Sequence, residues 1–387
     1  MRLTEESLIK LRNYIEKENY SGYDLYDGLN ITNNTFVINN YYLNTFITQF
    51  FKLNPINTRK FLAMKKTMMP KAIGIFLNAY TNLLSIHSDD EFVKARIDKL
   101  VDFLNGSSVK GYSGNCWNFG FNYKFMFDKP TVVITSIIAK GLFNYFQLTK
   151  DKQTKDMLIG VKEFIIKDLI ISKQNEGICF SYTPIKEELC FNASMLAAET
   201  LSRIYYIEKD QELLSYIKKS VEFVLAHQKD DGRWNYSKNL NTGVEREQVD
   251  FHQGYVLESL DEIRRLTDLK IPGLEDSIRK GAEFYRREQF FENGRSKWRL
   301  PKIWPVDIHN QAQGIITFSK LSYLNPEYSD FAKKIAKWTI DNMQDKKGYF
   351  YFRKGRFITN KISYMRWSNA WMFLALTEIL ILPKKQL

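Results

Sequence analysis

Apolar residues recur at helical spacing along almost the whole of this chain, and this periodicity restricts its fold more than any other feature. Apolar side chains three or four residues apart form one face of an α-helix, and no long alternating strand pattern competes with them. The spacing predicts an all-α protein with helices over residues 5–18, 40–53, 71–86, 91–104, 130–149, 152–171, 190–207, 210–228, 250–267, 274–290, 308–322, 328–344 and 366–382.

A weak internal repeat groups these helices into pairs. The second helix of each pair is expected to end in a glycine that is followed by aromatic residues, because a glycine just past a helix end readily adopts the left-handed conformation. Successive glycines are separated by 66, 55, 62 and 54 residues, a period that fits two helices and their connections. These glycines are Gly111, Gly177, Gly232, Gly294 and Gly348.

The repeat predicts a closed ring of helix pairs. One pair cannot bury its own apolar face, so successive pairs are expected to pack side by side. Six pairs close into inner helices surrounded by outer ones, and we predict this (α/α)6 toroid as a single domain over residues 1–387, with residues 1–35 forming a helix and loop that lead into the ring. An open solenoid is the alternative, which the uneven period and long aromatic connections disfavour. In a closed ring, all glycine-marked connections lie on one rim.

The net charge and the motifs in the sequence limit the kinds of molecule that the protein is expected to bind. The net charge of +12 fits simple solubility, and it also fits attraction of an anionic partner. An acidic poly- or oligosaccharide is favoured over nucleic acid, because no nucleic-acid-binding motif is present. No phosphate-binding glycine loop or dinucleotide fingerprint appears, so no cofactor is expected. The sequence does not indicate an oligomeric state.

The cysteines and the hydropathy of the sequence indicate the cellular compartment of the protein. The three cysteines, Cys116, Cys179 and Cys190, suit neither a disulfide framework nor a zinc site. The chain contains no apolar run of about 18 residues, so no membrane span is predicted. The N-terminus lacks the apolar core of a signal peptide. We therefore expect a cytoplasmic protein.

Two connections end in a shared Asp-x-His pattern, in Asp250–His252 and Asp307–His309. Each aspartate lies where an inner helix should begin, and capping of that helix is one interpretation. The other is an acid/base pair, because an inverting glycosidase needs two carboxyl groups about 6.5–9.5 Å apart. We assign catalytic roles to both aspartates and both histidines. A metal site is a weaker alternative, and no metal is predicted.

Aromatic and polar side chains in the same connections are candidates for substrate binding. Aromatic faces stack on sugar rings while their polar tips hydrogen-bond; packing of the connections onto the ring is the alternative. Arg366 offers a fork for a carboxylate, or pairs with a rim aspartate, and the neighbouring Tyr364 is a candidate for proton transfer. The predicted substrate-binding residues are Trp117, Tyr123, Asp128, Tyr182, Trp234, Tyr236, Trp304, Gln311, Arg366 and Trp367.

Short segments along nearly the whole chain also carry a recognisable pattern: Tyr20–Asn30, Gly111–Gly114 with Cys116 and Trp117, Pro130–Val133, Ser181–Pro184 with Asn192–Ser194, Phe251–Tyr255, Asp307–His309 with Ala312 and Gln313, and Tyr364–Trp367 with Ala370 and Trp371. As a set they resemble the VpsJ-like proteins of bacterial polysaccharide gene clusters, within the six-hairpin glycosidase-like toroids. The resemblance implies an (α/α)6 toroid and a role in capsule or exopolysaccharide metabolism. It implies no particular reaction.

Two functions remain open from the sequence. The first is an enzyme that acts on an anionic, uronic-acid-containing glycan, with hydrolysis slightly ahead of lyase or C5-epimerase chemistry. The second is a non-catalytic toroid that binds glycan or serves as a scaffold in polysaccharide biosynthesis.

Overall fold

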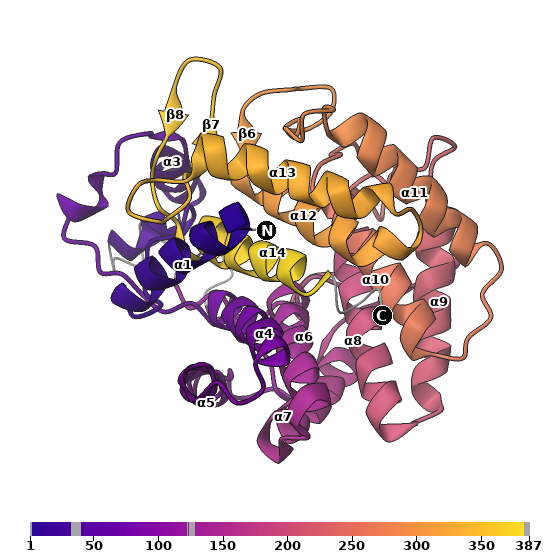
Figure 1. Cartoon of the computed structure of the whole chain (residues 1–387). Helices are drawn as coiled ribbons and strands as arrows, with labels where there is room; N and C mark the ends of the chain where they lie inside the picture. The colour runs from indigo at the N-terminus through magenta and orange to yellow at the C-terminus, as the bar shows by residue number, and fades with distance from the viewer. Residues whose placement is uncertain (1, 32–39, 122, 124–127, 383–387) are drawn as a thin grey trace.

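The computed structural model describes residues 2–31, 40–121, 123 and 128–382. Its centre is a closed ring of six inner helices (Figure 1) in which each packs against the next and the last packs against the first. In chain order these are α4 (Pro70–Ile86), α6 (Val132–Thr149), α8 (Phe191–Glu208), α10 (His252–Leu266), α12 (Ile308–Lys320) and α14 (Trp371–Leu380).

Six outer helices surround the ring. They are α5 (Glu91–Gly106), α7 (Lys152–Glu163), α9 (Glu212–Ala226), α11 (Leu274–Gln289), α13 (Glu327–Met343) and α1 (Arg2–Lys17). The last of these corrects our expectation for residues 1–35, because α1 does not lead into the ring but packs on α13 and α14 as its sixth outer helix. The two ends of the chain therefore close the toroid together.

Burial explains which helices lie inside. Inner helix α8 is buried along most of its length, whereas α11 buries residues such as Ile278 and Tyr285 and exposes charged ones on its other face. Helix α6 is apolar and long enough to meet the composition of a membrane span, but 61% of that window is buried inside the molecule. It lies between α4 and α8 in the ring, so packing accounts for its composition.

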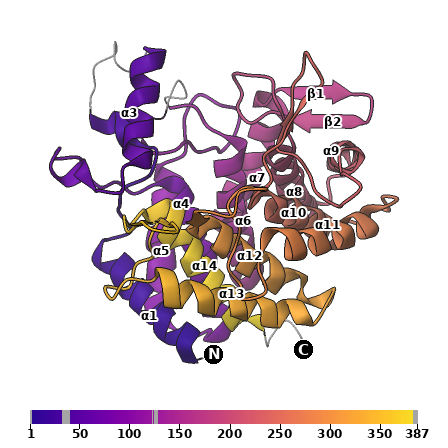
Figure 2. The ribbon, with the colours of Figure 1, turned by 90° about the horizontal axis from the view of Figure 1, so that it is seen from above.

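Further elements lie outside the two helix layers. Helix α3 (Tyr41–Leu53) stands on the side of the ring that carries the β1–β2 hairpin (Figure 2). Short 3-10 segments are η1 (Asp27–Ile31), η2 (Thr58–Lys60) and η4 (Leu321–Tyr323), and π-helical turns are η3 (Phe164–Asp168) and η5 (Met365–Ala370). Every helix predicted from periodicity is present, although the one predicted over 152–171 ends in the π turn at Asp168.

Short antiparallel strands tie neighbouring connections together. Strands β1 (Ile171–Gln174) and β2 (Gly177–Phe180) form a hairpin, β3 (Leu189–Cys190) joins β4 (Ser237–Lys238) and β5 (Glu245–Arg246), and β6 (Val306–Asp307) joins β7 (Arg353–Lys354) and β8 (Thr359–Asn360). The pairs β3–β4 and β6–β7 each link two successive connections, with Leu189 opposite Lys238 and Val306 opposite Lys354.

The repeated glycines do not terminate helices as predicted. All five have a left-handed φ, but Gly348, for example, lies five residues beyond the end of α13 at Met343. A Cβ on Gly348 would lie 2.2 Å from the Lys10 carbonyl oxygen of α1. The glycine is needed because the connection passes directly against the backbone of the next outer helix.

A second repeat fastens the connections to the inner helices and is more regular than the glycines. A polar side chain near the start of an inner helix accepts a hydrogen bond from a backbone amide of the preceding connection. The acceptors are 59, 59, 58 and 58 residues apart, and they are Thr135, Ser194, Gln253, Gln311 and Asn369.

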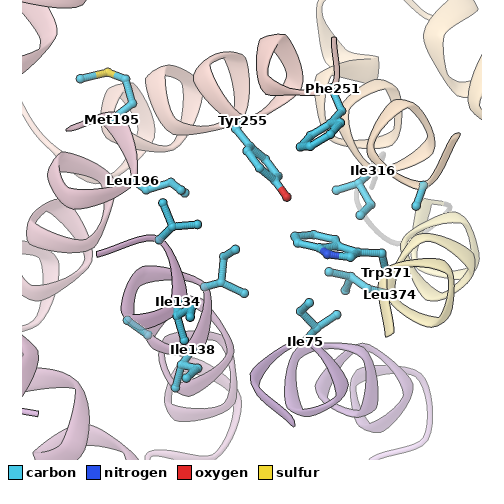
Figure 3. Close-up of a cluster of buried hydrophobic side chains, with 14 of the residues drawn as sticks. Ile75, Ile134, Ile138, Met195, Leu196, Phe251, Tyr255, Ile316, Trp371 and Leu374 are labelled. Atoms are coloured by element: carbon cyan, nitrogen blue, oxygen red, sulfur yellow. The ribbon is translucent and has the colours of Figure 1, made fainter. Parts of the chain in front are cut away.

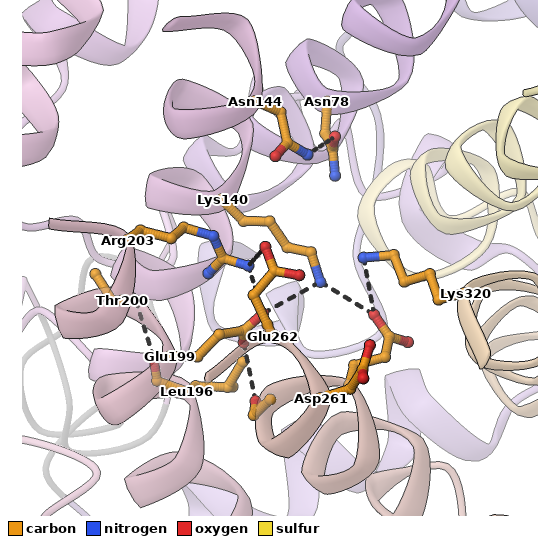
Figure 4. Close-up of polar contacts among 12 residues, drawn as sticks. Asn78, Lys140, Asn144, Leu196, Glu199, Thr200, Arg203, Asp261, Glu262 and Lys320 are labelled. Atoms are coloured by element: carbon orange, nitrogen blue, oxygen red, sulfur yellow. Dashed lines mark hydrogen bonds and ion pairs between the residues drawn. The ribbon is translucent and has the colours of Figure 1, made fainter. Parts of the chain in front are cut away.

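The middle of the ring is filled by side chains of two kinds. One group is apolar and aromatic, with Ile75, Tyr255, Ile316 and Trp371 pointing inward (Figure 3). The other is charged (Figure 4): Lys140 Nζ, near the middle of α6, lies 3.0 Å from Glu258 Oε2, near the middle of α10. Because side chains fill the middle of the ring, the connections that precede the inner helices are the place for a site.

Candidate functional site

The six connections from outer to inner helices meet on one rim, as predicted. The first amide of an inner helix repeatedly donates to the next connection: Val132 N to Tyr182 O, Phe191 N to Tyr236 O, Ile308 N to Phe352 O and Met365 N to Tyr23 O. In the opposite direction, Leu300 N of the connection before α12 donates to Val249 O of the connection before α10, and the rings of Tyr26 and Tyr123 meet across the remaining gap. Residues far apart in sequence are therefore held side by side.

His252 lies in the first turn of α10 and is oriented by Asp250. Its Nδ1 lies 2.5 Å from Asp250 Oδ1, while Oδ2 accepts from Gln248 Nε2 at 3.0 Å and faces Arg299 Nε at 3.2 Å. Burial raises the pKa of Asp250, but His252 and Arg299 outweigh it and the net pKa is lowered. Asp250 is an ionised carboxylate with both oxygens bound, and the hydrogen bonds of His252 to described residues are made by its backbone amide and Nδ1, which leaves Nε2 without a hydrogen bond to them.

The second histidine lies on the other face of Phe251. The Phe251 ring is stacked between His252 and His309, with centroids 4.2 and 4.1 Å away. His309 Nε2 lies 2.7 Å from the Tyr255 hydroxyl. Burial, reinforced by the nearby charge of Lys71, holds the pKa of His309 well below its usual range, so this imidazole is neutral at pH 7.

Asp307 caps α12, and like Asp250 it has both carboxylate oxygens bound. Its Oδ1 accepts from the backbone amide of His309 at 3.1 Å and from Trp367 Nε1 at 2.8 Å. Its Oδ2 accepts from Arg353 Nε at 2.7 Å. The capping interpretation therefore holds for this aspartate, and both of its oxygens are bound by donors from other connections.

Arg366 binds a carboxylate of the protein itself. Its Nε and Nη2 donate to Asp24 Oδ2 and Oδ1 at 2.8 and 2.7 Å, and the pair is almost completely buried. Burial lowers the pKa of Arg366 but Asp24 raises it further, so the guanidinium stays charged. The N-terminal segment that sequence reasoning left unplaced thus forms part of the rim.

Tyr364 is turned away from this group, contrary to the prediction. Its ring is fully buried in a separate apolar cluster with Tyr23 and Phe51, and its hydroxyl accepts from Arg59 Nη1 at 3.3 Å. Burial raises the pKa of Tyr364 to about 12. Arg59 also pairs with Asp27 at 2.7 Å, so this tyrosine belongs to a structural ion-pair cluster and does not reach the histidines.

A band of half-buried aromatic rings follows the rim. Tyr26 contacts both Tyr123 and Trp367, with centroids 5.1 and 6.1 Å apart. Trp367 continues to Phe251 at 5.8 Å, and the ring of Tyr236 meets His252 at 4.8 Å. Tyr182 lies nearby, since its electrostatic neighbours include Tyr123 and Arg366. Each of these tyrosines, together with Trp367, keeps part of its surface accessible.

Three predicted substrate-binding residues are structural. Trp117 and Trp234 are fully buried, and their indole N–H groups donate to Leu104 O at 2.8 Å and Val224 O at 3.0 Å in the preceding outer helices. Gln311 is also fully buried, because its Oε1 accepts from the backbone amide of Ser296 at 2.6 Å as part of the fastening repeat. No substrate can contact these side chains.

Two further candidates lie apart from the histidines. Trp304 is half-buried beneath Arg295, whose guanidinium carbon is 4.1 Å from its ring centroid. Asp128 is exposed, with a left-handed φ of 56°. The structure shows no contact that joins either residue to His252 or His309 among the described residues.

Sequence reasoning missed three members of the site. Asp24 was noted only within the Tyr20–Asn30 segment, and Tyr255 only within the Phe251–Tyr255 segment. Lys71 received no attention, although it is a single lysine in the first turn of an otherwise apolar helix. It is 6% exposed, its Nζ lies 5.7 Å from the Trp371 ring centroid, and burial with the charge of Arg366 lowers its pKa well below the usual range.

Comparisons with known proteins agree on the fold. No family model matches the chain, and no curated protein matches its sequence. Among solved structures, cellobiose 2-epimerase from Bacillus thermoamylovorans is similar with a TM-score of 0.65 at 13% identity, over 82% of this chain and 90% of the other. An unsaturated glucuronyl hydrolase specific for heparin has a TM-score of 0.65 at 13% identity, over 99% and 97%.

A third structure, the Lin0763 protein from Listeria innocua, has a TM-score of 0.66 at 12% identity, over 100% of this chain and 99% of the other. At these identities the similarity establishes the (α/α)6 toroid and nothing finer.

Proposed function

We propose that this protein is a carbohydrate-active enzyme whose site on the rim performs acid/base chemistry with His252 as the group that moves the proton. The observation that carries the proposal is the pair His252–Asp250, in which the carboxylate holds Nδ1 at 2.5 Å and Nε2 is left without a partner among the described residues. A carboxylate in that position fixes the tautomer and stabilises the imidazolium that forms when Nε2 accepts a proton.

This geometry supports proton transfer at a sugar carbon better than hydrolysis by paired carboxylates. A general acid for hydrolysis must hold a proton near neutral pH. Burial raises the pKa of Asp250, but its cationic partners lower it on balance, and Asp307 is bound by Arg353 at 2.7 Å. We therefore place epimerase, isomerase or lyase chemistry ahead of hydrolysis, which reverses the preference drawn from sequence.

The aromatic band supports a sugar as the substrate. Tyrosine and tryptophan rings with accessible faces offer stacking surfaces to sugar C–H groups, and Tyr236 touches the ring of His252. The structural relatives include an epimerase and a glucuronyl hydrolase. We further propose a cytoplasmic role in bacterial surface-polysaccharide metabolism, with an acidic glycan as the substrate.

The masses of the products distinguish the possible reaction classes. Neutral and uronic-acid oligosaccharides are incubated with the protein in H2O and in D2O, and the products are weighed. Epimerisation or isomerisation leaves the mass unchanged in H2O and adds deuterium in D2O. Elimination splits the chain without adding water, and hydrolysis splits it and adds one water.

The variant His252→Asn is expected to lower kcat by about 10²–10⁴-fold, because it removes the proton acceptor. Asp250→Asn should lower kcat with little change in KM, since it only orients His252. The matched control is His87→Asn, an exposed histidine at the far end of α4. Full activity of His252→Asn would refute the assignment. Binding without turnover across the panel would favour the non-catalytic glycan-binding function instead.

A further inference from the structure

Two buried hydrogen-bonding atoms beside the histidines, His309 Nδ1 and Trp371 Nε1, have no partner among the described residues, and their residues are 1% and 5% exposed. A third group, the amine of Lys71, lies beside them on a residue that is 6% exposed, and its one contact there is with the Trp371 ring. Buried polar groups are normally satisfied, so each exception needs an explanation. Two such exceptions beside a lysine that has no carboxylate partner indicate that something outside the protein chain completes the site.

The three groups come from adjacent inner helices and surround one ring. Trp371 opens α14, which lies between α4, carrying Lys71, and α12, carrying His309. The Trp371 ring centroid is 4.8 Å from the His309 ring and 5.7 Å from Lys71 Nζ. Figure 3 shows Trp371 pointing into the ring beside Tyr255, and the two distances place His309 and Lys71 around the same indole.

All three groups are donors. The indole N–H of tryptophan only donates, and the lysine amine has hydrogens to donate whether it is neutral or protonated. For His309, the Tyr255 hydroxyl is the stronger acid and the imidazole nitrogen the stronger base, so we assign the 2.7 Å contact as the hydroxyl donating to Nε2. In a neutral imidazole the hydrogen then sits on Nδ1, which makes that nitrogen a donor as well.

The surrounding charges leave this donor group without an anion. The charged groups that act on Lys71 are Arg366 and Asp24, with His309 close by. Both oxygens of Asp24 are already bound by Arg366, at 2.7 and 2.8 Å. Within the described residues Lys71 forms no ion pair, so its amine faces the Arg366 cation and no free carboxylate.

We infer that Lys71, His309 and Trp371 form a pocket for an oxyanion, and that its occupant is the carboxylate of a uronic acid. This inference rests on the proposed function, because it names the class of sugar that would bind beside His252. A planar carboxylate offers several lone pairs to donors that converge from different sides. Its binding would also supply the counter-charge that Lys71 lacks.

Calorimetry with the full chain tests the inference. Glucuronate, glucose and glucose 6-phosphate are titrated in two buffers that differ in ionisation enthalpy. We expect glucuronate to bind at least about tenfold more tightly than glucose, as charge-assisted hydrogen bonds allow. We also expect proton uptake on glucuronate binding, because the anion raises the depressed pKa of Lys71.

Lys71→Met should remove both the preference for glucuronate over glucose and the proton uptake. Trp371→Phe replaces the indole with an apolar ring that has no N–H donor, and it should weaken glucuronate binding. Lys347→Met, a lysine at a surface groove, is the matched control and should change neither. If Lys71→Met does not fold, Trp371→Phe still decides the matter.

Each outcome separates the two claims. Equal affinity of the wild type for glucuronate and glucose, or a Lys71→Met variant that binds glucuronate normally, would overturn the pocket even if neutral sugars are turned over by His252. Tighter binding of glucose 6-phosphate than of glucuronate would overturn the carboxylate assignment. Glucuronate binding with proton uptake but no turnover of any sugar would leave the pocket intact and refute the enzyme.

Discussion

The buried pair of Asp24 and Arg366 is expected to hold the N-terminal segment onto the last inner repeat, and a double-mutant cycle can measure how strongly. Asp24→Asn keeps the acceptor that binds the Tyr26 amide at 3.0 Å but removes the negative charge. Arg366→Met removes the positive charge and preserves most of the side-chain volume. The double variant removes both charges.

The magnitude follows from burial. Asp24 is 0% and Arg366 is 2% exposed, and two hydrogen bonds join them. Removing one partner of such a pair costs about 3–5 kcal/mol, because the other charge stays buried without compensation. With about 2.1 cal/mol/K of unfolding entropy per residue, this lowers Tm by ~4–6 °C for a chain of 387 residues.

Urea unfolding and calorimetric Tm are measured for the wild type, both single variants and the double variant. We expect the double variant to lose much less stability than the two single losses combined, because neither charge is then left alone. The control is Arg2→Met, whose ion pair with Glu6 is exposed and should leave Tm unchanged. Additive losses in the cycle would refute the pairing and with it the placement of the N-terminal segment on the rim.

Three further predictions concern stability and binding. Burial raises the pKa of Asp27 to about 6 despite its cationic partner, so its stabilising contribution is complete below its unfolded pKa near 3.8 and is lost as pH rises through 6. In urea unfolding, the free energy of unfolding of the wild type relative to Asp27→Asn should fall by about 3 kcal/mol between pH 3.5 and pH 7. A difference that stays constant with pH would contradict this. Gly348→Ala should lower Tm more than Gly243→Ala, because both have a left-handed φ but only Gly348 lies against a neighbouring backbone; equal losses would argue against the close approach. Trp234→Phe should lower Tm and leave sugar affinity intact, whereas Tyr236→Ala should weaken sugar binding as well as lower Tm, because its ring lies at the rim and also packs on the core; intact affinity in Tyr236→Ala, or weakened affinity in Trp234→Phe, would contradict their placement.

Helices were predictable because their determinants are local. The segment predicted over 274–290 is found as Leu274–Gln289, since apolar residues on one face and charged ones on the other already define an outer helix. The role of α1 was not predictable from such patterns. It rests on contacts such as Gln344 Nε2 to Ser7 O, 337 residues apart in sequence, and no local periodicity records which helix closes a ring.

The site was predictable only in outline. The Asp-x-His pattern located His252 and His309, but one donor to Asp250, Arg299, comes from a connection about fifty residues away. The error at Trp234 was not avoidable from spacing. Residues two apart in an extended segment are expected on one face, but the Trp234 indole donates to Val224 of the outer helix while the Tyr236 ring lies at the rim against His252.

The central claim is that connections distant in sequence build one sugar-binding site on a single rim, and photolabelling tests it most directly. An oligosaccharide of uronic acids that carries a diazirine is photolysed on the wild type, and the labelled peptides are identified by mass spectrometry. We predict adducts in the peptides that contain Tyr236, His252 and Trp367, and their loss when unlabelled oligosaccharide competes. Adducts confined to the outer helices, with these three peptides unlabelled, would contradict the claim.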